Sequence, residues 1–129
     1  MTQLSSQPVT AFELHQEIKR RKNMVDEAIS DLMTSITKKL ESENEYIKAK
    51  AKARIQSVAT DSDRREADHN AYVSKATDTE RFNAALQKEM LKYQYKVLDA
   101  RMSQLSATQT DAKVVMQEMR FAQTGPTEF

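Results

Sequence analysis

The stretch that decides the fold is residues 13–58, ELHQEIKRRKNMVDEAISDLMTSITKKLESENEYIKAKAKARIQSV, in which apolar side chains recur at helical spacing. They form two interleaved series with a step of eleven residues: Leu14, Val25, Ile36, Ile47 and Val58, and Ile18, Ile29, Leu40 and Ala51. Eleven residues make three turns at about 3.67 residues per turn, which keeps a seam nearly straight on a helix. The stretch therefore predicts one long helix with a buried apolar seam.

Glycine and proline are absent from residues 9–124, because the chain holds only Pro8, Gly125 and Pro126. These two residue types most often interrupt helices and supply the turns of compact enzymes. Thr10 and Glu13 have the spacing of a capping box and mark an expected helix start. The sequence predicts an all-α protein built from one or two very long helices.

Residues 59–81, ATDSDRREADHNAYVSKATDTER, interrupt the apolar seam. Two signals for a new helix occur here, Thr60 to Asp63 and the capping-box pair Thr77 and Glu80. The first zone, 59–64, is the favoured bend of a helical hairpin, and 76–79 is the alternative bend. A continuous coiled-coil rod with this stretch as a solvated waist remains the other topology.

Residues 82–122 change to a heptad pattern, which is typical of coiled coils. Its four-three steps give the seam Leu91, Tyr95, Leu98, Met102, Leu105, Gln109, Ala112, Met116 and Met119. A second apolar stripe lies about 140° around the same helix and consists of Leu86, Met90, Tyr93 and Val97, with Ala100 beyond. A helix that is apolar on two faces contacts two neighbours, so we assign this second stripe to a partner and the first to the N-terminal helix.

The composition excludes several classes of protein. The chain of 129 residues carries a net charge of +1, whereas domains that depend on phosphate contacts are usually much more basic. It has no cysteine, so a disulfide framework, a thiol nucleophile and a cysteine metal site are excluded. No apolar run approaches the roughly 20 residues of a membrane span, and no ordinary signal peptide is recognisable. We expect a cytoplasmic protein or one exported without a cleavable signal peptide.

No catalytic constellation is present in the sequence. His15 and His69 are 54 residues apart, and neither has a second histidine at the helical spacing of a ligand pair. We interpret His69 as a solvated residue. The glycine-dependent phosphate, calcium and nucleophile-elbow motifs cannot occur in a stretch without glycine. We therefore expect no enzyme activity, no cofactor and no metal site.

Basic residues suggest one alternative function. Lys88, Lys92 and Lys96 are four residues apart and form one stripe on a helix, which could meet phosphates or an acidic helix. Two further tracts, residues 19–22 and 48–54, are also basic. Aromatic residues make up only 6% of the chain, and a stacking platform for single strands is not evident. Nucleic-acid binding is therefore the less favoured reading.

In overall character the chain resembles the small helical needle, inner-rod and filament subunits of bacterial type III secretion machines. The shared features are the uncharged start MTQLSSQPVTAF, the absence of cysteine, the near absence of glycine and the C-terminal seam that ends in VVMQEMRFAQT. The resemblance implies polymerisation or docking through the helices, without catalysis. Virion internal proteins and small helical chaperones have a similar composition.

These observations predict three regions: a flexible leader (1–12), a long-helix coiled-coil domain (13–122) and a flexible tail (123–129). We expect a structural or assembly protein, such as a secretion-apparatus or virion component, that associates with itself or with a helical partner. The alternatives are a cytosolic helical adaptor or chaperone and a nucleic-acid-associated helical protein. The residues expected to form the helix seams are Ile18, Val25, Ile29, Ile36, Leu40, Ile47, Val58, Leu91, Tyr95, Leu98, Met102 and Leu105.

Overall fold

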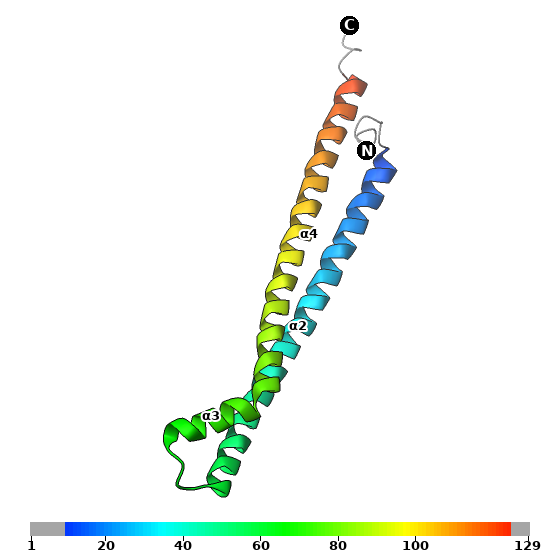
Figure 1. Ribbon diagram of the computed structural model, residues 1–129. Coiled ribbons are helices and arrows are strands. Elements are labelled where there is room, and N and C mark those ends of the chain that lie inside the picture. Colours follow the sequence, from blue (N-terminus) through cyan, green and yellow to red (C-terminus); the bar gives the residue numbers. More distant parts are fainter. Residues whose placement is uncertain (1–9, 125–129) are drawn as a thin grey trace. The chain divides into compact units, whose positions relative to one another are not determined.

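The structure is a computed structural model that describes residues 10–124. It contains three helices, α2 (Ala11–Thr60), α3 (Glu66–Ala76) and α4 (Asp78–Thr124) (Figure 1). Helices account for 94% of the described residues, far above the roughly one-third of an average globular domain. The all-α prediction is confirmed, and of the two topologies that the sequence left open the structure agrees with the hairpin, with α2 and α4 as its arms, and not with the continuous rod. Residues 1–9 of the predicted leader and 125–129 of the predicted tail lie outside the described residues.

The start of α2 follows from its sequence. The backbone N–H of Glu13 donates a 3.1 Å hydrogen bond to Oγ1 of Thr10, so Thr10 caps the helix as its spacing predicts. Because no glycine or proline follows until Gly125, nothing in the backbone ends the helix before Thr60. At Asp61, the side chain accepts a hydrogen bond from the N–H of Asp63 and forms the turn out of the helix.

The connection between the arms uses both expected zones. α2 ends inside 59–64, and α3 gives way to α4 inside 76–79. The capping box expected at Thr77 is wrong, because its hydroxyl donates to the carbonyl of Val73 at 2.7 Å instead of accepting from the next helix. Residues 60–63 do not start a helix either. α3 begins only at Glu66, after Arg65, whose side chain makes no capping hydrogen bond.

The chain divides into two compact units. The terminal unit consists of Met1–Ile29 and Val97–Phe129, of which 10–29 and 97–124 are described. The central unit is Ser30–Lys96 and contains the rest of α2, all of α3 and the start of α4.

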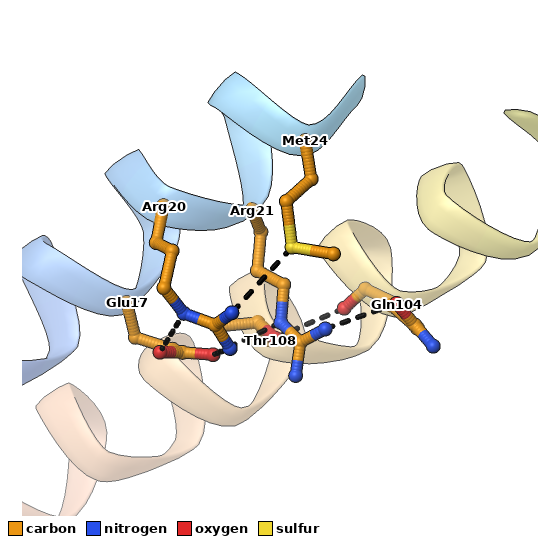
Figure 2. A network of polar contacts seen from close by, with 6 residues as sticks. All are labelled: Glu17, Arg20, Arg21, Met24, Gln104 and Thr108. Atoms are coloured by element: carbon orange, nitrogen blue, oxygen red, sulfur yellow. Dashed lines mark hydrogen bonds and ion pairs between the residues drawn. The ribbon is translucent and has the colours of Figure 1, made fainter. Parts of the chain in front are cut away.

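In the terminal unit, α2 and α4 run antiparallel. Nη1 of Arg21 donates to Oε1 of Gln104 at 2.9 Å, and Nη1 of Arg101 donates to the carbonyl of Met24 at 2.8 Å. Chain positions that rise on α2 therefore fall on α4. Figure 2 shows that Arg21 also contacts Glu17 on its own helix, at 2.9 Å, so one guanidinium joins both arms.

The contact face of the terminal unit is mainly apolar. Ala28 and Ala112 are buried. Around them lie half-buried aliphatic side chains from both helices: Leu14, Ile18, Val25, Val97, Leu98, Leu105 and Val115. Apart from the adjacent Val97 and Leu98, these positions are three, four or seven residues apart on each helix, which is the spacing of a coiled-coil seam.

The inner face of the central unit is different, because its buried positions hold small or polar residues. They are Ser35, Ser42, Ala53, Ser57, His69 and Thr77. From α4 the half-buried residues Ala84, Gln87 and Gln94 are added, and large apolar side chains such as Leu32 and Leu91 are only half-buried. Glu80 also reaches this unit's interior, where its buried Oε2 has no hydrogen-bond partner among the described residues. The fully buried positions of this unit are thus small or polar, and its larger apolar side chains are at most half-buried.

Candidate helix-docking surfaces

The second stripe on α4 is largely open to solvent. In the central unit Leu86 is 44% exposed, Met90 43% and Tyr93 62%, while Val97, the first α4 residue of the terminal unit, is half-buried. Because Val97 lies on the contact face of the terminal unit, we call only Leu86, Met90 and Tyr93 the α4 stripe. Between 43% and 62% of the surface of each of these residues stays exposed, and that part is available to another helix.

Only some residues of the seam predicted on α4 are covered within the chain. Leu91, Leu98 and Leu105 are half-buried. The expectation is wrong for Tyr95 and Met102, which are 49% and 52% exposed. The reason is geometric, since Leu91, Leu98 and Leu105 follow a strict seven-residue step, and Tyr95 and Met102 lie four residues further on, at the edge of that face.

The eleven-residue seam of α2 is not buried within the chain, which corrects the main expectation from the sequence. Ile18, Val25 and Ile36 are half-buried, but four further members are exposed: Ile29, Leu40, Ile47 and Val58. The last three lie in the central unit. Together with the exposed Met33 and Ile55 they make an outward-facing row on one helix. We call Met33, Leu40, Ile47, Ile55 and Val58 the α2 stripe.

The difference between an eleven-residue and a seven-residue spacing explains why the apolar series of α2 does not stay on its buried face. Within the chain, α2 is buried at a seven-residue step through Ala28, Ser35 and Ser42. A seven-residue step and an eleven-residue step drift in opposite directions around an ideal helix. By the middle of α2, Leu40 is two residues from the buried Ser42, and two residues turn a helix by about 200°. The large apolar side chains therefore lie nearly opposite the inner face.

The lysine stripe is not part of a pocket or cluster arranged to bind a phosphate group. Lys88, Lys92 and Lys96 are exposed, and Nζ of Lys92 contacts Oε1 of Glu89 at 3.1 Å. No second basic element is shown beside them in the described part of the chain. The stripe remains compatible with a solubilising face.

In the first basic tract, residues 19–22, the two arginines already form ion pairs. Arg20 and Arg21 both bind Glu17, at 2.8 and 2.9 Å (Figure 2). The hydrogen bond from Arg20 is the main cause that lowers the pKa of Glu17. Two of the four cations of residues 19–22 are thus paired along their own helix.

At the bend, His69 is buried, so its interpretation as a solvated residue is wrong. It is 5% exposed, and its Nδ1 lies 2.6 Å from Oγ of Ser57, which is fully buried. Nη1 of Arg64 donates to the same Oγ at 3.2 Å and to the carbonyl of Ser57 at 2.8 Å. These bonds fasten α3 and the preceding loop to the end of α2.

An exposed ion pair supports the same contact. Both terminal nitrogens of Arg54 donate to the carboxylate of Glu66, at 2.9 and 2.7 Å. The hydrogen bond from Arg54 is the main cause that lowers the pKa of Glu66. Ser57 is fully buried beside this ion pair, and its hydrogen bond with His69 links α2 to α3.

The described residues hold no group of three or more histidine, aspartate or glutamate side chains arranged to bind a metal ion. Nor is any helix among them both long and apolar enough to cross a membrane. The α2 and α4 stripes are rows of exposed large apolar residues on the central unit.

Compared with known proteins, the chain matches no family model, no curated protein and no solved structure.

Proposed function

We propose that this chain is a structural or assembly protein that associates through the outward-facing stripes of its central unit. One observation carries the proposal. The fully buried positions of the central unit hold small residues and His69, larger apolar residues such as Leu32, Ile36 and Leu91 are only half-buried, and the residues of the α2 and α4 stripes are exposed. A helical pair that folded and acted alone would have the reverse pattern.

The energetics support association. Pairing through serine and alanine removes little apolar surface from water, and long helices need packing on an apolar face for stability. Covering one leucine, isoleucine or methionine of the stripes contributes about 1–2 kcal/mol, because each is already partly covered within the chain. Exposed apolar patches of this kind commonly mark protein–protein contacts. Docking of another helix on the stripes would therefore bury the apolar surface that the two arms leave exposed, and would add to the free energy of unfolding.

A helical adaptor or chaperone is the second candidate, because the same stripes could hold the amphipathic helix of another protein. The two functions differ in what the purified chain does alone. An assembly subunit grows with its own concentration, whereas an adaptor stays at a small fixed size until its client is added.

The test is sedimentation across a concentration series with the double variant Leu40→Ser and Ile47→Ser. We expect the unchanged chain to form larger species as concentration rises and the variant to lose at least most of this growth. At low temperature the variant should keep its helices, because neither side chain belongs to the inner face, although loss of association should lower its unfolding midpoint.

The matched control is Ser30→Ala with Thr34→Ala, two exposed positions on the same helix beside the stripe. This control should assemble as the unchanged chain does. If the stripe variant also assembles normally, the α2 stripe is not the association surface.

A further inference from the structure

The bend between α2 and α3 reverses the chain without the residues that usually make a bend. Residues 61–65, DSDRR, connect the two helices and contain neither glycine nor proline. No described residue has a positive φ, so the reversal uses no left-handed backbone conformation. Aspartate, serine and arginine also occur inside helices. The backbone therefore does not force the chain to turn back at this point, and we call residues 61–65 the hinge.

Contacts within a short stretch of chain hold the hinge in its bent form. The N–H of Arg64 donates to the carbonyl of Asp61 at 3.4 Å, which closes a four-residue turn. The Asp61 side chain accepts a hydrogen bond from the N–H of Asp63 at 3.1 Å. Nη1 of Arg64 donates to the carbonyl of Ser57 at 2.8 Å and to Oγ1 of Thr60 at 2.9 Å. Opening of the hinge would break these local bonds.

Two further contacts join α2 to α3 and do not depend on the bend. Ser57 forms a hydrogen bond with His69, and Arg54 binds Glu66, in each case across twelve residues of chain. None of these four residues belongs to the hinge. An α3 supplied by a second copy would therefore make the same two contacts with the same geometry.

We propose that two copies of the chain exchange arms through the hinge. In the exchanged dimer, α2 and α3 of each copy join through a helical hinge, and the α2 of each copy packs against the α3 and α4 of the other. Exchange of identical elements reproduces between copies the contacts that the single chain makes within itself. The inference goes beyond the proposed function, because it uses the inner faces of the arms and not the α2 and α4 stripes.

Protein concentration decides between the two forms. A helical hinge adds backbone hydrogen bonds from each N–H to the carbonyl four residues earlier, and it loses the turn at Asp61 and the bonds of Arg64. The closed form needs only one molecule, so it is favoured at low concentration, whereas mass action favours the exchanged dimer at high concentration. Exchange is also slow, because the arms must separate first.

Proline at position 62 separates the two forms. Ser62 is the second residue of the turn from Asp61 to Arg64, a position where proline is favoured. In a helical hinge the same proline would remove one backbone hydrogen bond and clash with the carbonyl of Val58. Ser62 is exposed, so the substitution leaves the interior unchanged. Ser62→Pro should therefore keep the bent form and prevent exchange.

A cross-link between the arms reports which form is present. The side chains of Arg21 and Gln104 meet at 2.9 Å in the terminal unit, and the chain has no cysteine of its own. A chain with Arg21→Cys and Gln104→Cys is unfolded, refolded at low or high concentration, and treated with a short bismaleimide. The closed form yields a covalent monomer, whereas the exchanged dimer yields a covalent dimer.

We expect covalent dimers to become more abundant as the refolding concentration rises. Ser62→Pro in the same chain should reduce the dimer fraction at least about tenfold, because both hinges of a dimer would hold proline inside a helix. The matched control is Ser62→Ala with Asp63→Ala, at two exposed positions. It should raise the dimer fraction several-fold, because alanine favours the helical hinge.

Two results overturn the proposal: covalent monomers alone at every concentration, or equal dimer fractions with and without Ser62→Pro. Circular dichroism checks that the proline variant keeps its helices. If it does not, Ser62→Gly with Asp63→Gly replaces it, since glycine disfavours a helical hinge without fixing the turn. An unchanged dimer fraction in the glycine variant likewise overturns the proposal.

Leu40→Ser with Ile47→Ser separates this inference from the proposed function. Both positions are exposed and lie outside the hinge, so this variant should lose growth through the stripes and keep its cross-linked dimers. Ser62→Pro should have the opposite effect, with stripe association retained and arm exchange lost. Each mode of self-association thus fails or stands without the other.

Discussion

His69 joins two helices through one short hydrogen bond to Ser57, and Arg64 completes the contact from the loop between them. Arg64 donates to the serine oxygen, and the same hydroxyl shares a hydrogen bond with Nδ1 of the histidine whose direction is set by the histidine tautomer. Arg64 also lies over the ring of Tyr72, 4.9 Å from its centroid. Four side chains from α2, the loop and α3 thus hold the bend together.

Replacing His69 with alanine should destabilise the bend. The change leaves Ser57 without its main side-chain partner in a buried position, and such losses typically cost about 1–3 kcal/mol. Denaturant unfolding at fixed protein concentration measures the free energy, and hydrogen exchange of the α3 amides localises it. The control is His15→Ala, at an exposed position, which should change the free energy by less than about 0.5 kcal/mol. Equal effects of the two variants would contradict a structural role for His69.

The sequence could not identify this contact, because a histidine among Arg65, Glu66 and Asp68 has the surroundings of a solvated residue. What buries it is a helix only eleven residues long that folds back onto the end of α2. That placement depends on contacts between residues twelve positions apart, which a periodicity does not contain. By contrast, the cap at Thr10 is a local feature and was predicted from spacing alone.

At the scale of elements, α4 has two apolar faces, one packed against α2 and one exposed. Leu98 and Leu105 lie half-buried against α2 in the terminal unit. Leu86, Met90 and Tyr93 are exposed on the central unit. Because these faces are about 140° apart on one helix, changes to one leave the other in place.

This separation predicts different outcomes for two double variants. Leu98→Ala with Leu105→Ala should destabilise the protomer by roughly 2–4 kcal/mol for the pair, below the usual cost of two fully buried leucines because both are half-buried. Leu86→Ser with Tyr93→Ser should weaken association and keep most of the helix. Circular dichroism and sedimentation on the same samples measure both. The assignment of faces would be reversed if the second pair lost helix and the first pair lost only assembly.

For α2, the sequence predicted the helix but placed its inner face wrongly. The prediction took the large residues, such as Ile47, as the buried seam, although Ile47 is 60% exposed. The available signal was the row of small residues at seven-residue spacing: Ala28, Ser35, Ser42 and Ala49. Small side chains permit close approach of two helices, but serine and alanine are equally common on solvated faces. A single sequence therefore gave no reason to prefer them.

At the scale of the molecule, the absence of glycine and proline from residues 9–124 made the all-α class predictable, and the break in the seam made the hairpin predictable. The division of the chain into a terminal and a central unit could not be predicted from the sequence. The central unit depends on small and polar contacts, whereas the terminal unit has the apolar seam. We therefore expect the stability of the central unit to depend on association.

A direct consequence is that thermal stability should depend on protein concentration. Association binds only the folded chain, so mass action raises the unfolding midpoint as concentration increases. Circular dichroism melts over a hundredfold range of concentration should show a rising midpoint for the unchanged chain and a nearly constant one for Leu40→Ser with Ile47→Ser. A midpoint independent of concentration in the unchanged chain would show that the protomer is stable alone.

The two periods of α2 also limit how the length of this protein can change in evolution. Removing seven or eleven residues from the helix rotates everything after the deletion by only about 20°, so both faces keep their direction. Removing one residue rotates it by about 100° and turns serines outward and isoleucines toward α4. Homologues should therefore differ in this helix by insertions or deletions of seven, eleven or their sums, while single-residue length changes should be confined to the loop at 61–65.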